Sequence, residues 1–207
     1  MKQRNQKTVL PNGRSSTPAP TQSTRNRAGE KIRFLAVTGL IAGLYTALTL
    51  VLAPLSFGPV QCRVAEALTI LAAYTPAAIP GLTVGCILSN VVGLSMGANV
   101  AGALDILLGP LATGLAAWLT YHLRGARVWG LPLWSSIPPV ITNALIVGTE
   151  LAVVLVPDLT VYGWLGWVAS VAAGQIIACM GGGLLLAQTL QKTGFATRLE
   201  RNDYTFR

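Results

Sequence analysis

The chain has 207 residues, of which 52% are hydrophobic and only 11% are charged. Because a soluble domain carries about 25% charged residues, this composition excludes an ordinary soluble protein and predicts one whose solvent is the lipid bilayer. The net charge of +8 belongs to the two ends of the chain. These ends lack the interleaved aromatic residues of a nucleic-acid-binding segment, so nucleic acid is not an expected partner.

Residues 1–33 are rich in Lys, Arg, Pro, Ser and Thr and hold almost no apolar residues. Because such a segment cannot bury a core, we expect a disordered basic tail on the cytoplasmic side of a membrane. No small-residue cleavage site follows the first apolar stretch, so the segment does not resemble a signal peptide. Residues 191–207 are also basic and are predicted to form a C-terminal cytoplasmic tail.

Residues 34–190 are predicted to form an all-α, polytopic membrane domain of six transmembrane helices. A span needs about 20 mostly apolar residues, and Gly, Pro and polar residues separate the apolar stretches in this chain. Six spans return both termini to the same side, which the basic tails identify as the cytoplasm. The predicted spans are residues 34–53, 61–75, 77–95, 100–122, 134–156 and 161–190.

The loops agree with this orientation. Arg124 and Arg127 lie between the fourth and fifth spans, on the predicted cytoplasmic side. The loops predicted to lie outside contain no Lys or Arg, apart from Arg63 near the start of the second span. The sequence has no G-x-x-x-x-G-K-[ST] loop for ATP, so uphill transport would need a gradient or a partner.

Polar side chains inside the predicted spans are the candidate functional residues, because ionisable groups in lipid are costly and therefore carry function or find a partner. The predicted orientation places polar groups of five spans in the outer half of the membrane. This is the layout of a small-molecule cavity open to the outside. The candidate site residues are Arg63, Glu66, Asn90, Asp105, Asn143, Glu150, Trp164 and Gln175.

Each of the charged candidates near the second and fourth spans has two interpretations. Arg63 and Glu66 are three residues apart and would share one face of an α-helix. In the first interpretation, Arg63 and Glu66 form a structural ion pair. In the second, the Glu66 carboxylate is free to accept a ligand, and Arg63 keeps it charged and oriented. Asp105 either lines the cavity or caps the start of the fourth span.

The later spans leave similar alternatives. Asn143 either makes a hydrogen bond between helices or contacts a ligand. Glu150 has no Lys or Arg within one helical turn, so it finds Arg63 across the bundle, holds a proton, or meets a ligand. Trp164 and Trp167 fit either an aromatic belt at the membrane surface or stacking against a flat ligand.

Metal and catalytic chemistry find little support in the sequence. The three cysteines are scattered in apolar stretches without a C-x-x-C pair, which predicts neither a zinc site nor a disulfide framework. The single histidine, His122, is assigned to the cytoplasmic end, where a Ser–His pair with the outer serines is not expected. We predict no metal, no cofactor and no enzyme activity.

Gly39, Gly43 and Ala47 recur every four residues in the first span and form a stripe of small side chains. Such a stripe lets another helix approach closely. The partner is either a helix of the same chain or a separate membrane subunit.

Several motifs closely resemble the queuosine-precursor transporter (QueT) family, in the same order as the predicted spans and over residues 34–190. The second-span motif APLSFGPVQCRVAEAL contains both Arg63 and Glu66. The other motifs are TPAAIPG at 75–81, GCILSN at 85–90, LDILLG at 104–109 with LAT at 111–113, and NALIVG at 143–148 with Glu150 and Leu151.

The resemblance implies a substrate-binding S component of an energy-coupling-factor importer in the bacterial plasma membrane. Such a component has six helices, captures its substrate on the outer side, and topples in the membrane to release it. The implied partners are a transmembrane coupling subunit, which would meet the stripe of Gly39, Gly43 and Ala47, and two cytoplasmic ATPases. ATP hydrolysis would therefore occur on the partner subunits.

The implied substrate is a 7-deazaguanine precursor of queuosine. Its guanine-like edge offers adjacent N–H donors to a carboxylate, and its carbonyl and ring nitrogens suit an amide. Glu66 and Glu150 are the candidates for the carboxylate roles, and Asn90, Asn143 and Gln175 for the amide roles. The alternatives are a stand-alone proton-coupled transporter of a small polar heterocycle or vitamin, an intramembrane enzyme, and a scaffold without a ligand.

Overall fold

The computed structural model describes residues 22–58, 62–158 and 160–201. This part of the chain is all-helical and has no strands. The helices are α1 (Gln22–Val51), α2 (Ala53–Ser56), η1 (Val64–Ala73), α3 (Ala78–Ser95), η2 (Gly102–Leu104), α4 (Asp105–His122), η3 (Leu123–Gly125), η4 (Trp134–Ser136), α5 (Ile137–Leu155), α6 (Val161–Gln175), η5 (Ile176–Gly182), α7 (Gly183–Lys192) and α8 (Phe195–Arg201).

Five apolar helical segments of the described chain are long enough to cross a membrane. The remaining predicted span, residues 61–75, contains only η1, a ten-residue 3₁₀-helix. At a rise of about 2 Å per residue, η1 is about 20 Å long and is shorter than the hydrocarbon core of about 30 Å. The structure therefore confirms five of the predicted segments as helices that are long and apolar enough to span a membrane. The count of six and the cytoplasmic placement of both termini stay predictions.

The first helix begins earlier than the sequence indicated. The predicted disordered tail is too long, because residues 22–33 form the first turns of α1. Gln, Arg, Ala, Glu and Lys, which favour helix, are frequent in this segment and extend the apolar helix toward the N-terminus. Residues 1–21 of that predicted tail lie outside the described residues, as do residues 202–207 of the C-terminal tail.

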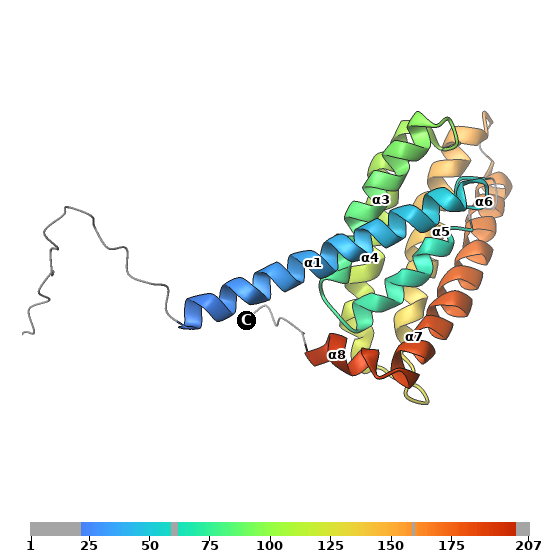
Figure 1. Cartoon of the computed structure of the whole chain (residues 1–207). Helices are drawn as coiled ribbons and strands as arrows, with labels where there is room; N and C mark the ends of the chain where they lie inside the picture. Colours follow the sequence, from blue (N-terminus) through green and yellow to red (C-terminus); the bar gives the residue numbers. More distant parts are fainter. Residues whose placement is uncertain (1–21, 59–61, 159, 202–207) are drawn as a thin grey trace, which may run out of the picture.

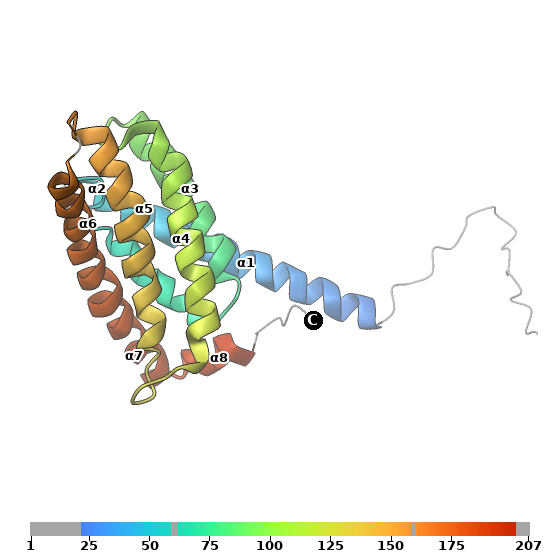
Figure 2. The ribbon, with the colours of Figure 1, turned by 180° about the vertical axis from the view of Figure 1, so that it is seen from behind.

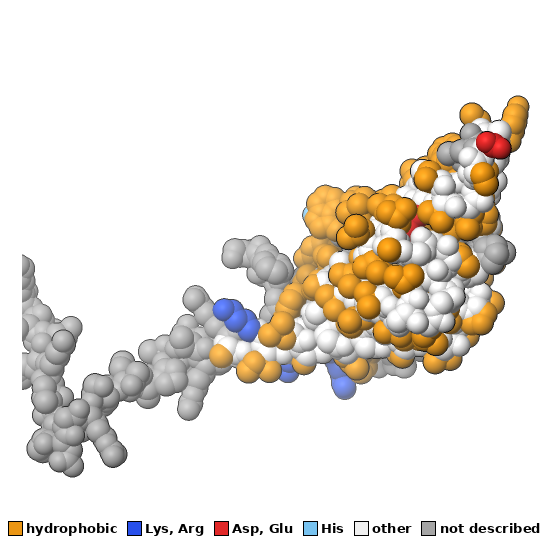
Figure 3. Space-filling model, turned by 90° about the horizontal axis from the view of Figure 1, so that it is seen from above, with side chains coloured by type: hydrophobic (Ala, Val, Ile, Leu, Met, Phe, Trp, Pro, Cys, Tyr) orange, Lys and Arg blue, Asp and Glu red, His pale blue; other side chains and the backbone are white. Residues whose placement is uncertain are grey.

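Helices α3 to α7 run roughly along one direction, and α1 crosses them obliquely, with its N-terminal part projecting beyond the bundle (Figure 1). The view from behind shows the α3–α4 and α5–α6 connections at one end of the bundle and α8 at the other (Figure 2). The start of α1 and the end of α8 both lie toward this second end. The outward-facing side chains are largely hydrophobic, as expected of helices bathed in lipid (Figure 3).

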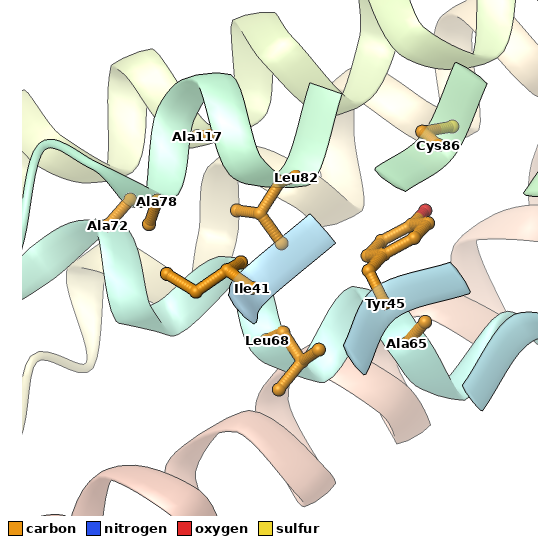
Figure 4. Close-up of a cluster of buried hydrophobic side chains, with 9 residues drawn as sticks. All are labelled: Ile41, Tyr45, Ala65, Leu68, Ala72, Ala78, Leu82, Cys86 and Ala117. Atoms are coloured by element: carbon orange, nitrogen blue, oxygen red, sulfur yellow. The ribbon is translucent and has the colours of Figure 1, made fainter. Parts of the chain in front are cut away.

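Close packing of α1 on α3 depends on two glycines of α3. A Cβ atom at Gly81 would lie 2.9 Å from the carbonyl oxygen of Thr38, and one at Gly85 would lie 2.9 Å from that of Ala42. Figure 4 shows the apolar cluster at this crossing, where Ile41 and Tyr45 of α1 meet residues of η1, α3 and α4. The cluster fixes α1 and η1 against the bundle and so positions the polar residues beside them.

Candidate functional site

The predicted polar residues lie inside the bundle and not on lipid-facing surfaces. Glu66, Asn90, Glu150 and Gln175 come from four different helical segments, and their exposed fractions are 1%, 0%, 2% and 4%. Arg63, Asp105 and Asn143 are equally buried. Trp164 differs, since it is half-buried near the start of α6. The sequence thus identified a set of side chains that the fold removes from lipid.

Arg63 pairs with Asp105, and not with Glu66. Its Nη2 atom lies 3.0 Å from Oδ2 of Asp105, and both side chains are buried. The same Oδ2 accepts a hydrogen bond of 2.9 Å from Nδ2 of Asn99. The alternative of an Arg63–Glu66 ion pair is therefore wrong, and Asp105 acts as the partner of Arg63. We refer to Arg63, Asn90, Asn99 and Asp105 as the arginine network.

Asn90 joins the arginine network through a short hydrogen bond of 2.5 Å from its Nδ2 to the backbone oxygen of Asp105. Gly109 provides the space for this contact, because a Cβ there would lie 2.4 Å from Oδ1 of Asp105 and 2.6 Å from Nδ2 of Asn90. Three buried atoms of the network have no hydrogen-bond partner among the described residues: Oδ1 of Asn90, Oδ1 of Asp105 and Nε of Arg63.

Glu66 lies in a separate group that we call the hydroxyl cluster. Its carboxylate accepts hydrogen bonds from Tyr45 of α1 at 2.5 Å, from Thr113 of α4 at 2.8 Å and from Thr69 of η1 at 3.0 Å. Glu66 is therefore not the free acceptor that the sequence allowed. Its carboxylate instead ties η1 to α1 and α4.

The thiol of Cys86 lies between the two groups. Its Sγ is 3.3 Å from Nη1 of Arg63 and 3.6 Å from the hydroxyl oxygen of Thr113. The sequence did not identify Tyr45, Cys86 and Thr113 as site residues, because a cysteine or hydroxyl residue in an apolar helix carries no pattern of its own. It also did not identify Asn99, which lies in the connection between α3 and η2. Cys86 and Thr113 do belong to motifs that carry the resemblance.

Glu150 is the polar residue that the fold leaves without a partner. Both of its carboxylate oxygens are buried and accept no hydrogen bond from the residues that the structure describes. Glu150 also forms no ion pair with Arg63, because the Arg63 guanidinium pairs with Asp105. A buried carboxylate without a donor is strongly unfavourable, so this position needs a proton, a bound water molecule or a ligand.

Asn143 lies seven residues before Glu150 on α5, so the two side chains share one helix face about 10 Å apart. Its buried Nδ2 donates to no group in the described part of the chain, so no helix–helix hydrogen bond from this amide is seen. Helix α5 packs between α4 and α6 and also contacts η5. Two unpartnered polar groups of opposite hydrogen-bonding character therefore face the interior from one helix.

Gln175 and Trp164 are engaged with protein groups. Oε1 of Gln175 accepts a weak hydrogen bond of 3.2 Å from Cys179, and the π-helix η5 begins directly after Gln175. Such π-helical turns are frequent at functional sites. Nε1 of Trp164 donates to Thr149 at 2.9 Å, which fastens α6 to α5. Trp167, one turn later, packs against the apolar cluster that contains Val147 and Leu151.

The stripe of Gly39, Gly43 and Ala47 is exposed on α1. A Cβ at Gly39 or Gly43 would meet no atom within 4 Å. Packing within the described part of the chain therefore does not explain this stripe, and the close approach of α1 to α3 uses the opposite face of α1.

No group of three or more His, Cys, Asp and Glu side chains within residues 22–58, 62–158 and 160–201 forms a metal-binding arrangement. His122 lies at the far end of α4, where its Nδ1 is 2.8 Å from the backbone oxygen of Trp118. The site is thus a set of hydrogen-bonding and charged groups suited to holding a small polar molecule.

A family model described as QueT transporter matches residues 35–192. The "Queuosine precursor transporter QueT" of Lactococcus lactis subsp. cremoris (strain MG1363) is 31% identical over 81 residues, which are 38% of this chain and 44% of that protein. The match thus spans less than half the length of that relative. No solved structure matches the chain.

The family match includes η1 and helices α3 to α7 in full, and with them every predicted polar site residue. It agrees with an all-helical protein that has several helices apolar enough to cross a membrane. The chain belongs to the QueT transporter family.

Proposed function

We propose that the chain is the substrate-binding S component of an ATP-driven energy-coupling-factor importer in the bacterial plasma membrane. We further propose that it captures a 7-deazaguanine precursor of queuosine on the outer face. Family membership and the relative's name support the transport of such a precursor. The observation that carries the assignment of the site is the buried carboxylate of Glu150, whose two oxygens have no donor among the described residues.

The ligand chemistry follows from the unpartnered atoms. Glu150 offers two acceptor oxygens to the adjacent N–H donors of a guanine-like edge, and Nδ2 of Asn143 offers a donor to a carbonyl or ring nitrogen. Oδ1 of Asn90 and Oδ1 of Asp105 are further acceptors. Glu66 is assigned a structural role because three hydroxyl groups already occupy its carboxylate.

The buried charges favour a ligand with a positive substituent. Among the described buried residues, Glu66, Asp105 and Glu150 are acidic and Arg63 is basic. Asp105 pairs with Arg63, and Glu66 is stabilised by its hydroxyl donors, so Glu150 is left without a positive partner. An aminomethyl group on the deazaguanine ring would add positive charge to the buried site as a whole. Because this group lies on the opposite side of the ring from the guanine-like edge that Glu150 would bind, it would meet a second acceptor, for which Oδ1 of Asp105 is available.

The proposed partners are a transmembrane coupling subunit and two cytoplasmic ATPases. The exposed stripe of Gly39, Gly43 and Ala47 is the proposed contact for the coupling subunit, because its small side chains allow another helix to come close. The absence of a P-loop from the sequence agrees with ATP hydrolysis on other subunits.

Gly43→Leu is expected to abolish co-purification with the coupling subunit. The free energy of unfolding should not fall and should rise by up to about 1 kcal/mol, because glycine in a helix interior is less favourable than leucine. Gly85→Leu is the matched control on the packed side of α3, where a Cβ already meets Ala42 at 2.9 Å. This control should lower the unfolding temperature of the isolated protein. Retention of the complex by Gly43→Leu would place the docking surface elsewhere.

The function is tested by uptake of a labelled 7-deazaguanine into proteoliposomes that contain the chain with or without its partners. We expect uptake only with the coupling subunit, both ATPases and ATP, and no effect of an uncoupler. Uptake by the chain alone that an uncoupler abolishes would instead favour the proton-coupled transporter. Turnover of the compound, lost in His122→Ala, would favour an enzyme.

A further inference from the structure

Glu150 differs from the other two buried acidic residues of the described chain in what surrounds its carboxyl group. Oδ2 of Asp105 lies 3.0 Å from Nη2 of Arg63, which supplies an opposite charge. The carboxylate of Glu66 accepts hydrogen bonds from three hydroxyl groups. Glu150 is buried, and neither of its oxygens accepts a hydrogen bond from a described residue. Of these three negative charges, that of Glu150 is therefore the one that the described residues do not stabilise.

The elements packed against α5 do not offer a cation to Glu150. Helix α5 lies beside α4 and α6 (Figure 2) and also contacts η4 and η5. His122 is the only basic residue on these four elements, but it ends α4 at the far end of the bundle, whereas Glu150 lies in the half of α5 nearer the α5–α6 connection. The other titratable residues on them are Asp105 and Tyr121 of α4, the exposed Tyr162 of α6, and Cys179 of η5.

A proton suits the Glu150 carboxyl group better than a water molecule does. A water molecule supplies hydrogen bonds, but it leaves the negative charge without compensation inside the bundle. Burying an uncompensated carboxylate costs far more than burying a neutral polar group, so such a carboxylate binds a proton instead. The neutral acid is therefore the form of Glu150 that fits the empty site.

A guanine-like edge requires the opposite form of the carboxyl group. This edge presents adjacent N–H donors, and a carboxylate receives two of them because both of its oxygens are acceptors. A protonated carboxyl group has an O–H donor on one oxygen, and this donor would point at an N–H donor of the ligand. The O–H bond of Glu150 must therefore break before both N–H···O hydrogen bonds can form.

The charge of the buried groups also favours such an exchange. When a ligand with a cationic aminomethyl group enters and the proton of Glu150 leaves, the net charge of the ligand and the buried side chains together stays the same. A neutral ligand that displaces the proton would instead leave one more negative charge inside the bundle. The exchange therefore predicts tighter binding of the cationic ligand.

We propose that Glu150 holds a proton in the empty protein and that binding of a 7-deazaguanine displaces this proton into water. The proposal rests on the proposed function, because it takes Glu150 as the residue that binds the N–H edge of the ligand. Since the ligand-bound protein holds fewer protons than the empty protein, raising the pH favours binding, by up to about tenfold in affinity for each unit of pH.

The test is calorimetric titration of the purified full chain with 7-aminomethyl-7-deazaguanine at neutral pH, in two buffers that differ in ionisation enthalpy. The difference in binding heat gives the number of protons released. We expect about one proton per ligand for the wild-type chain and for Asp158→Asn, a control at an exposed acidic residue, and none for Glu150→Gln. Unsubstituted 7-deazaguanine, which has no amine to titrate, should release the same number of protons while binding more weakly.

Infrared difference spectroscopy of the same samples gives a second readout. The C=O stretch of a protonated carboxyl group should be lost when the ligand binds to the wild-type chain, and Glu150→Gln should show no such loss. Ligand binding without proton release and without loss of this band would overturn the inference and leave the proposed function intact. Failure of both 7-deazaguanines to bind would overturn the inference together with the proposed function.

Discussion

Glu150→Gln is expected to weaken binding of a 7-deazaguanine ligand by about 10- to 150-fold, because losing a hydrogen bond to a charged group costs about 1.5–3 kcal/mol. The substitution keeps the shape of the side chain and removes its charge and one acceptor. The free energy of unfolding of the empty protein should stay the same or rise, since a buried carboxylate without a donor is unfavourable. Calorimetric titration and thermal unfolding measure the two effects on the same sample.

Asp158→Asn is the matched control, because Asp158 is exposed in the α5–α6 connection. It should change neither binding nor stability. A lower unfolding temperature in Glu150→Gln would show that Glu150 is structural, and unchanged binding would show that the ligand lies elsewhere. A binding residue is kept at some cost in stability, so its substitution weakens ligand binding without lowering the free energy of unfolding. Substitution of a residue that maintains the fold lowers the free energy of unfolding.

Asp105→Asn is expected to lower the free energy of unfolding by about 3–5 kcal/mol, because it leaves the buried guanidinium of Arg63 without a counter-charge. Adding Arg63→Met to Asp105→Asn should recover much of that loss, since the double variant buries no unpaired charge at this position. Thermal or denaturant unfolding of the single and double variants gives the coupling energy of the pair.

The exposed Arg127–Glu200 pair provides the comparison, because Glu200→Gln should cost no more than about 1 kcal/mol. A loss of that small size in Asp105→Asn would contradict a structural role for the buried pair. Asp105 would then be available to the ligand as a second carboxylate, and Arg63 would need another partner.

The stretches able to span a membrane could be predicted from the sequence, because a long run of apolar residues is stable in few structures other than a helix in lipid. The exception is the second span, where Gly and Pro residues before it and Pro76 after it leave room for only η1. The same local irregularity explains why Arg63 does not pair with Glu66. Arg63 has an extended backbone before η1, with φ −81° and ψ 93°, so the helical three-residue spacing does not apply.

The partners of the polar residues could not be predicted, because they come from distant parts of the chain. Glu66 meets Tyr45 and Thr113, which are 21 and 47 residues away, and Asp105 is 42 residues from Arg63. Polarity inside an apolar run shows that a residue needs a partner. It does not show which one, so Glu66 and Glu150 were equivalent candidates until the fold separated them.

The small residues of α1 and α3 also show that the sequence does not identify the partner of a residue. For the stripe of Gly39, Gly43 and Ala47, the sequence allowed two partners: a helix of the same chain or a separate membrane subunit. The glycines that allow α1 to pack closely on α3 are Gly81 and Gly85, which are also four residues apart. Four-residue spacing predicts a surface for close helix approach in both cases, but only the arrangement of helices distinguishes an occupied surface from an exposed one.

The most direct measurement is an experimental structure of the purified chain with 7-aminomethyl-7-deazaguanine bound. We predict that the N–H donors of the ligand lie about 3 Å from the carboxylate oxygens of Glu150, with the Arg63–Asp105 pair and the three hydroxyl contacts of Glu66 unchanged. A ligand bound away from Glu150, or a Glu150 carboxylate held by protein donors in the liganded state, would contradict the account.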